Sequence, residues 1–224
     1  MKKLSYLSIL LIFILLMPAA AGATLIGLEL GLPDITSNST GTYNYYSGVD
    51  LFTSSAQALN ITFDGTTSIP ITSGSYSVQF HVDNSGNFVS GVSGYDLTIS
   101  GTFTYNNVVY SGVLIAGEVT NFGWQDIPGP YALFDFTFDF KEGALADLYG
   151  ASGNKGGDIF YAEKSNFAGN WDVSHSGTKV KHDTAPVPEP ATVFLLGLGF
   201  LGIMIFTKRK FEKQKSRPIT LEIP

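Results

Sequence analysis

The sequence contains no cysteine among its 224 residues. Disulfide frameworks, zinc–thiolate sites, iron–sulfur clusters and thiol catalysis are therefore excluded at once. Basic residues are scarce between residues 24 and 185, where five lysines and no arginine stand against sixteen acidic residues, a net charge of −11. Binding of nucleic acid needs charge of the opposite sign, so we do not expect nucleic acid as a partner.

Helical patterns are also scarce in this part of the chain, where few windows place apolar residues at i, i+3 and i+4. Alternation of apolar and polar residues with a period of two is common instead, as expected for antiparallel strands with one buried face. Four segments alternate in this way. They are 57–64, with Leu59, Ile61 and Phe63 on one face, 75–82, with Tyr76, Val78, Phe80 and Val82 on one face, 95–105, and 133–140, with Phe134, Phe136, Phe138 and Phe140 on one face.

Turn-forming residues separate the alternating segments, and Asn106 with Asn107 predicts a tight hairpin because both residues tolerate positive φ. Many short strands without helices between them predict an all-β sandwich or barrel. We therefore predict one antiparallel, jelly-roll-like β-sandwich over residues 24–178. Polar residues over 179–186 predict a flexible stalk after it.

The first 23 residues have the pattern of a secretory signal peptide. Lys2 and Lys3 precede an apolar run over residues 4–17, and small residues follow it. Ala21 and Ala23 fit the two small positions of a cleavage site, so we predict cleavage after Ala23.

The end of the chain has three consecutive parts, beginning with the motif Val187, Pro188, Glu189 and Pro190. Sixteen uncharged residues follow over 191–206. A helix rises about 1.5 Å per residue and the bilayer core is about 30 Å thick, so this segment predicts a short transmembrane helix over 191–207. Lys208, Arg209 and Lys210 then form a basic cluster that stops transfer and stays cytoplasmic, followed by a basic cytoplasmic tail over 211–224. The bulk of the chain is accordingly expected outside the inner membrane.

This order of Val-Pro-Glu-Pro, a Leu/Gly-rich span and Lys-Arg-Lys resembles the PEP-CTERM sorting signal, a tail also known as an ice-binding protein C-terminal domain. The resemblance covers roughly residues 186 to 210. It implies export by a Gram-negative bacterium and anchoring in the inner membrane. An exosortase, a membrane protease-transferase, would then process the chain near the Pro-Glu-Pro and deliver the domain to the cell surface or outside. Many such proteins accompany exopolysaccharide and biofilm genes. Unlike the usual family pattern, this chain continues past the basic cluster.

No catalytic constellation is visible in the sequence. Asp135 and Asp139 share a strand face but lie about 13 Å apart at 3.3 Å per residue, too far for a glycosidase pair, so a solvated polar face is the better interpretation. His81, His175 and His182 have no partners at the spacing that a metal site or a catalytic triad needs. We therefore predict no catalytic residues, no resident metal and no cofactor.

Two weaker binding hypotheses remain. Oxygen ligands in the acidic turn 83–87 suit Ca²⁺, although a plain hairpin turn explains the same residues. Trp171 and Trp124 are candidates for stacking on a sugar, although core packing competes with that interpretation.

The sequence as a whole favours a non-enzymatic, exported protein of the cell envelope or extracellular matrix, associated with exopolysaccharide or biofilm. The first alternative is a carbohydrate-binding, lectin-like module, with polysaccharide as its partner. The second is a secreted hydrolase whose site is assembled across strands.

Overall fold

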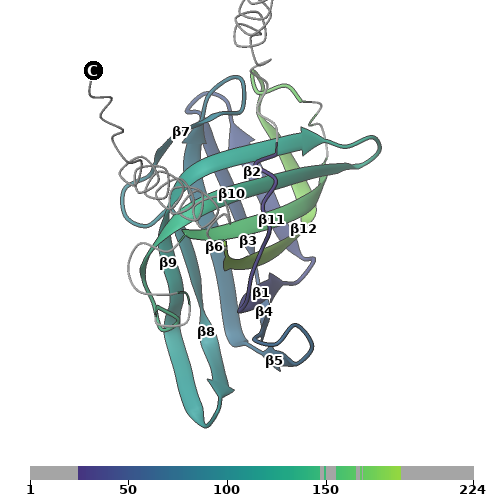
Figure 1. Cartoon of the computed structure of the whole chain (residues 1–224). Helices are drawn as coiled ribbons and strands as arrows, with labels where there is room; N and C mark the ends of the chain where they lie inside the picture. Colours follow the sequence, from purple (N-terminus) through teal and green to yellow (C-terminus); the bar gives the residue numbers. More distant parts are fainter. Residues whose placement is uncertain (1–24, 147–148, 150–154, 165–166, 168, 188–224) are drawn as a thin grey trace, which may run out of the picture. The chain divides into compact units, whose positions relative to one another are not determined.

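The computed structural model describes residues 25–146, 149, 155–164, 167 and 169–187 (Figure 1). These residues form twelve strands in one antiparallel sheet. In chain order the strands are β1 (Asp34–Ser37), β2 (Gly41–Tyr46), β3 (Leu51–Ala56), β4 (Ala58–Thr62), β5 (Ser68–Pro70), β6 (Thr72–Val82), β7 (Phe88–Gly91), β8 (Leu97–Tyr105), β9 (Val108–Asp126), β10 (Tyr131–Glu142), β11 (Lys155–Lys164) and β12 (His175–Pro186).

Eight of these strands close into a barrel. The order of hydrogen-bonded neighbours is β11-β10-β9-β8-β6-β3-β2-β12, and β12 pairs with β11 to complete the ring. The other strands extend it: β1, β4 and β5 continue the sheet from β12, and β7 pairs with β6. Closure leaves the eight barrel strands without unpaired edges, which removes the main route by which sheets pair with other chains.

Aromatic side chains fill the barrel. Phe134, Phe136, Phe138 and Phe140 of β10 all point inward and are at most 5% exposed. Phe52 of β3 contacts six other aromatic rings at centroid distances between 5.1 and 6.4 Å. An eight-stranded barrel is just wide enough for side chains to fill, so this packing supplies the hydrophobic core.

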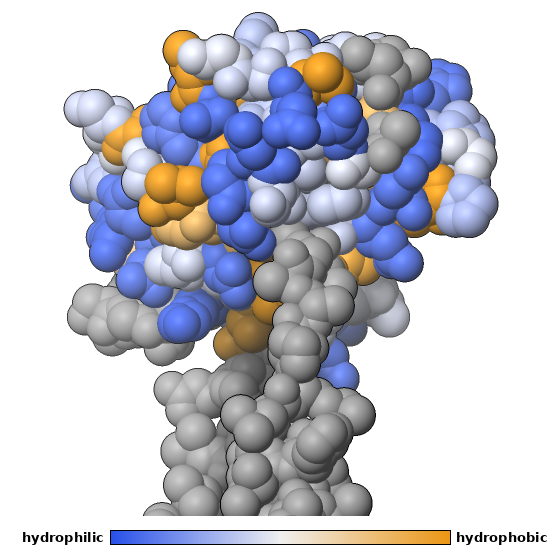
Figure 2. Space-filling view, turned by 90° about the horizontal axis from the view of Figure 1, so that it is seen from above, coloured by the Kyte–Doolittle hydropathy of each residue, from blue (hydrophilic) through white to orange (hydrophobic). Residues whose placement is uncertain are grey.

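The outer surface has a different character. Seen from above, it is mainly hydrophilic, and hydrophobic residues lie in separate small spots (Figure 2). The alternation along the strands therefore sorts side chains as expected for a sheet with one buried and one solvated face.

The structure confirms the all-β antiparallel class but corrects the predicted jelly-roll sandwich, because one sheet closes on itself. The inward faces of β6 and β10 are confirmed, as is the hairpin turn at Asn106 and Asn107, with φ of 50° and 63°. Leu59 is 40% exposed, contrary to its predicted face. The register slips there, between Thr36 and Ser37 of the neighbouring β1, and this bulge turns Leu59 outward.

Residues 179–186 are the last eight of the twelve residues of β12, so the predicted flexible stalk is wrong. β12 lies between β11 on one side and β2 and β1 on the other. Val180, His182 and Thr184 point inward and are fully buried. Lys181 and Asp183 lie on the outward positions, and their charges make the sequence of this strand resemble that of a polar linker.

The segment 25–31, here called the strap, crosses the outside of β10 and β11 (dark purple in Figure 1). The backbone N–H groups of Ile26 and Gly27 donate to the Asp135 carboxylate of β10, at 3.0 and 2.9 Å. The N–H of Gly31 donates to the Pro186 carbonyl of β12, at 2.8 Å. The strap therefore joins the beginning of the described chain to its last strand.

Candidate functional site

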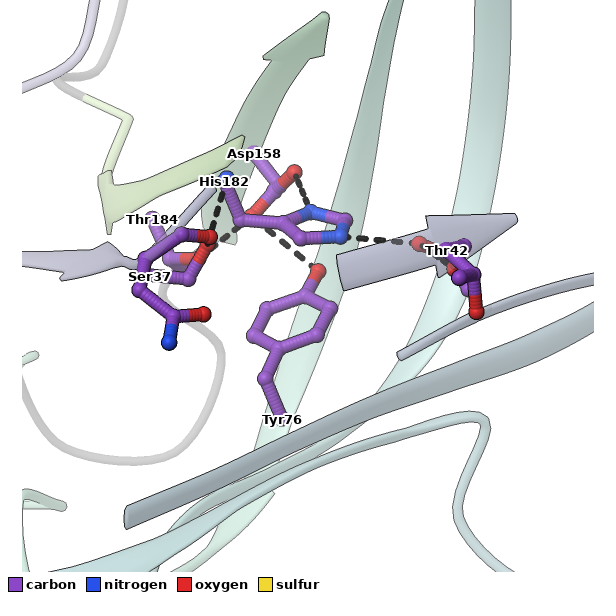
Figure 3. A network of polar contacts seen from close by, with 8 residues as sticks. Ser37, Thr42, Tyr76, Asp158, His182 and Thr184 are labelled. Carbon is purple, nitrogen blue, oxygen red and sulfur yellow. Dashed lines mark hydrogen bonds and ion pairs between the residues drawn. The ribbon is translucent and has the colours of Figure 1, made fainter. Parts of the chain in front are cut away.

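A network of buried polar side chains lies inside the barrel where β11 and β12 meet (Figure 3). Asp158 comes from β11 and His182 from β12, and both side chains are 0% exposed. His182 Nδ1 lies 2.9 Å from Asp158 Oδ1, and His182 Nε2 lies 2.9 Å from Ser54 Oγ of β3. The three side chains form a continuous hydroxyl–imidazole–carboxylate chain.

The second oxygen of Asp158 also accepts hydrogen bonds. The Tyr76 hydroxyl of β6 donates to Oδ2 at 3.0 Å, and the Thr184 hydroxyl donates to the same atom. With His182 Nδ1 on the first oxygen, three side chains converge on the Asp158 carboxyl group. Burial and the charge of Asp158 hold the pKa of Tyr76 well above its ordinary value, so the phenol keeps its proton and remains a donor.

Aromatic rings hold the imidazole in place. The Tyr76 ring stacks on His182 at a centroid distance of 3.8 Å and an interplanar angle of 23°, and Phe160 lies 4.5 Å away. The backbone N–H of His182 donates to Ser37 Oγ of β1 at 2.7 Å. The network thus connects side chains from β1, β3, β6, β11 and β12, which are far apart in the sequence.

A hydroxyl, an imidazole and a carboxylate in this order are the elements of a nucleophilic triad. Substrate must also reach the hydroxyl, and Ser54 is 3% exposed behind a fully buried His182. Ser54 Oγ lies 3.2 Å from the Thr42 carbonyl, to which the hydroxyl can donate. The hydrogen bonds of the network hold five strands together, but a substrate cannot reach the Ser54 hydroxyl in this structure.

Sequence patterns did not reveal this network, and His182 falls within the predicted stalk. Only Tyr76 was expected on an inward face, which is confirmed at 2% exposure. The signal that could have identified β12 is the alternation of Val180, His182 and Thr184, which has the period of a strand. The pattern is hard to recognise because His182 and Thr184 are polar, whereas the inward face of a strand is usually apolar.

A second feature is a cluster of rings, here called the aromatic cluster, that contains both tryptophans. Trp171 is 1% exposed and Trp124 is partly buried against the core, so both candidate stacking residues pack with the core. The ring of Trp171 lies 4.9 Å from His175 and 5.6 Å from Trp124, measured between centroids. The members of the aromatic cluster are Tyr43, Tyr45, Trp124, Phe167, Trp171 and His175.

Several buried polar atoms of the aromatic cluster have no hydrogen-bond partner among the residues that the structure describes: the Tyr43 hydroxyl, Nε1 of Trp124 and Trp171, and both ring nitrogens of His175. Burial lowers the pKa of His175 to about 4, so its ring is neutral at pH 7. Each unpaired buried polar group costs about 1–3 kcal/mol. A surface pocket of about 210 Å³ adjoins the cluster and is lined by Asn44, Tyr45, Tyr46, Ser174, His175 and Ser176.

The two aspartates of β10 have different environments. Asp135 is 2% exposed beneath the strap, so its predicted position on a solvated face is wrong. Burial raises the pKa of Asp135, while the backbone N–H groups of Ile26 and Gly27 act in the opposite direction. Asp139 is partly exposed, and its carboxylate lies 3.8 Å from the Lys141 ammonium group. Asp135 is thus bound by the backbone of the strap, whereas Asp139 faces a lysine of its own strand.

The Asp83 side chain forms hydrogen bonds within its own turn. The Asp83 carboxylate accepts hydrogen bonds from the N–H groups of Ser85 and Asn87 and from the Asn87 amide. This explains the hairpin turn between β6 and β7 without a cation. Within the described ranges, no group of three or more histidine, aspartate or glutamate side chains is arranged to hold a metal ion.

Most of the targeting residues lie outside the described residues. This applies to Ala21 and Ala23 of the signal peptide 1–23, to Pro188, Glu189 and Pro190, to the predicted helix 191–207, to Lys208, Arg209 and Lys210, and to the tail 211–224. Val187 is described, and its N–H donates to the Lys155 carbonyl at 2.9 Å. In the part of the chain that the structure covers, no helix has the length and hydrophobicity needed to cross a bilayer.

Comparison with protein families identifies the end of the chain. Residues 186–210 match the PEP-CTERM protein-sorting motif. The chain carries this motif. Its presence confirms the resemblance seen in the sequence, and it implies an exported protein that is sorted at a membrane as an exosortase substrate. No curated protein and no solved structure matches the chain.

The PEP-CTERM motif begins inside the folded domain. Its first residue, Pro186, is the last residue of β12 and is paired with Gly156 of β11. The sorting motif therefore follows the barrel without an intervening linker.

Proposed function

We propose that the barrel is a non-enzymatic structural domain that the PEP-CTERM motif delivers to the cell envelope or the extracellular matrix, where it works with exopolysaccharide or biofilm. The filled interior carries this proposal. Phe52, Phe80 and Phe134 have no exposed surface, and neither do Asp158 and His182 of the polar network. A closed, filled and acidic barrel is suited to a stable building element, whereas a hydrolase needs a reachable nucleophile.

The proposal can be tested in cells of the host that lack the native chain. The wild-type chain is expected to appear at the cell surface or in the matrix and to restore matrix cohesion. A chain with alanine at Pro188, Glu189 and Pro190 should be exported but not sorted correctly. Fractionation and rheometry of the matrix measure both effects.

A Ser54→Ala chain separates a structural role from a hydrolytic one. At matched protein level it should restore cohesion as well as the wild type does, because the structural role needs the fold and not the hydroxyl. Removing the hydroxyl takes a hydrogen-bond partner from His182 Nε2, so the melting temperature is expected to fall. Loss of cohesion at a matched level of folded protein would instead favour the hydrolase.

A carbohydrate-binding role is the second candidate, and the unpartnered polar atoms of the aromatic cluster favour it. Indole N–H groups, a phenol and an imidazole are groups that pair with sugar hydroxyls. Because these groups are buried, a sugar would have to reach them by opening the adjoining pocket, which is lined by Tyr45, Tyr46 and His175. The full chain would be applied to a glycan array with and without calcium. Binding of the chain to a glycan would support this role if Trp171→Phe weakens the binding without lowering the melting temperature. If the chain binds no glycan with or without calcium, this role is wrong.

A further inference from the structure

A surface pocket lies at the end of the barrel where the loop between β4 and β5 meets the hairpin of β8 and β9 (Figure 1). Its volume is about 190 Å³. The pocket is lined by Phe63, Asp64 and Thr67 of the loop, by Ile69 of β5 and by Tyr105 of β8. Asp64 and Thr67 are exposed, so a ligand can reach the pocket from solvent. None of these residues belongs to the polar network, the aromatic cluster or the sorting motif.

Two parallel aromatic rings form one wall of the pocket. Phe63 and Tyr105 stack at a centroid distance of 3.9 Å and an interplanar angle of 5°. Both rings are partly exposed, and both pack against the hydrophobic core. Phe63 lies 6.1 Å from the buried ring of Phe103, which itself stacks on Tyr110 at 4.8 Å. This wall is therefore apolar and held in place before a ligand arrives, which lowers the entropic cost of binding.

The Asp64 carboxylate is held by its own turn. Its Oδ1 atom accepts hydrogen bonds from the backbone N–H groups of Thr66 and Thr67, at 2.9 and 2.6 Å, and its Oδ2 atom accepts one from the Thr67 hydroxyl at 2.8 Å. These hydrogen bonds, first of all those from the backbone, hold the pKa of Asp64 well below its ordinary value, so the carboxylate is ionised. A carboxylate has about four acceptor positions. The turn uses three of them, which leaves one for a ligand.

The chemistry of the pocket favours a neutral sugar. The carbon–hydrogen face of a sugar ring packs on an aromatic ring, and its hydroxyl groups donate to a carboxylate. The five lysines of residues 24–185 lie outside the pocket, and sixteen acidic residues outnumber them, so an anionic ligand is repelled. Pockets for drug-sized ligands have volumes of about 300–1,000 Å³. The smaller volume of this pocket suits a single sugar ring.

We propose that this pocket binds one ring of a neutral glycan, which packs on Phe63 and Tyr105 and donates a hydroxyl hydrogen bond to Asp64. This inference rests on the proposed function, because it names the surface through which the barrel holds a polysaccharide. Binding here needs no opening of the barrel, since Asp64 and Thr67 are already exposed, whereas the unpaired polar atoms of the aromatic cluster are buried. The end of the barrel that carries β5 and the β8–β9 hairpin is thus the end that contacts the glycan.

The binding test applies the purified full chain, in detergent, to an array of neutral, amine-bearing and uronate-bearing oligosaccharides. The wild type should bind neutral glycans, and the one that binds most strongly is then titrated by calorimetry. Tyr105→Ala should weaken this binding at least about fivefold because half of the aromatic wall is lost, whereas Tyr105→Phe should bind as the wild type does. Asp64→Asn keeps the size of the side chain but removes the charge that accepts the hydroxyl, so it should weaken binding at least about threefold.

Tyr161→Ala is the matched control, because Tyr161 of β11 is 41% exposed and lies outside the pocket. It should bind the glycan as the wild type does. Equal weakening by Tyr161→Ala and Tyr105→Ala would mean that the glycan contacts exposed tyrosines in general, which overturns the site. If the melting curve shows that Tyr105→Ala does not fold, Asp64→Asn decides in its place, and undiminished binding by that variant overturns the site.

Other results separate this pocket from the alternatives. If the chain binds no neutral glycan, or binds only amine-bearing ones, the neutral-sugar site is wrong. If Trp171→Phe weakens glycan binding and Tyr105→Ala does not, the glycan binds at the aromatic cluster and the pocket is not its site. The matrix experiment is independent of both: cells that lack the chain without losing cohesion would contradict the proposed function, while the calorimetric titration still decides whether the pocket binds a glycan.

Discussion

Replacing Tyr76 with phenylalanine tests whether the buried polar network stabilises the barrel. The hydroxyl donates to Asp158 Oδ2 at 3.0 Å, and the ring stacks on His182 at 3.8 Å. Phenylalanine keeps the ring and its stacking, so the change removes one hydrogen bond to a buried carboxylate. No large cavity is created, because only one oxygen atom is lost.

The expected loss of stability follows from the charge of the acceptor. Hydrogen bonds to charged groups contribute about 1.5–3 kcal/mol, and Tyr76 is 2% exposed, so solvent cannot replace the lost donor without entering the core. Asp158 Oδ2 keeps the Thr184 hydroxyl as a donor. We therefore expect the free energy of unfolding to fall by about 1.5–3 kcal/mol.

Urea unfolding at pH 7, followed by tryptophan fluorescence, measures this difference, since Trp171 is in the core. Tyr46→Phe is the matched control: Tyr46 is 47% exposed on β2, and its change should stay within about 0.5 kcal/mol. If Tyr76→Phe costs no more than Tyr46→Phe, then Asp158 does not depend on this donor and the network is not a source of stability.

Three further predictions concern other parts of the barrel. His175 is neutral in the fold and has a pKa of about 4 against 6.5 in the unfolded chain, so the wild type should lose about 3 kcal/mol of stability as the pH falls from 6.5 to 4. His175→Phe should remove that loss in urea titrations at pH 7 and pH 4.5; an unchanged pH dependence would contradict the burial of a neutral ring. Burial and then the charge of Asp183 raise the pKa of Asp34 to about 6, so its folded form binds a proton more tightly and stability should fall as the pH rises from about 4 to 6. Asp34→Asn should flatten this part of the profile, and a steeper profile would show that the sign is wrong. Gly86 has φ of 76°, and a Cβ there would lie 2.2 and 2.4 Å from the two indole nitrogens; Gly86→Ala should therefore lower the free energy of unfolding by about 2 kcal/mol or more and shift the tryptophan emission, whereas Gly48→Ala should do neither.

The parts of the fold that sequence could predict are those decided by neighbouring residues. The inward faces of β6 and β10 follow from a period of two along one strand, and the turn at Asn106 follows from two adjacent residues. Leu59 could not be placed, because its outward turn depends on a bulge opposite Ser37 of β1. Closure of the barrel likewise depends on β12 pairing with both β11 and β2, a non-local choice that local patterns do not encode.

The polar network was hidden for a related reason. Ser54 and His182 are 128 residues apart, so only the closed barrel brings them to 2.9 Å. Sequence patterns treat a histidine, an aspartate and a threonine as surface residues, and each would be costly to bury alone. Together they satisfy one another, which makes the inward face of β12 polar and its composition similar to that of a linker.

The network also has a consequence for the place where the barrel ends. A slip of β12 by one residue against β11 would turn His182 outward and bring Lys181 or Asp183 into a lumen lined by Phe160. Such a slip would leave Asp158 without its imidazole partner and bury an unpaired charge, which costs far more than a lost apolar contact. The network therefore fixes the register of β12, and the register decides which residue pairs with Lys155 at the edge of the sheet. Because that residue is Val187, the buried histidine helps to determine which residue of the sorting motif is bound to the edge of the barrel.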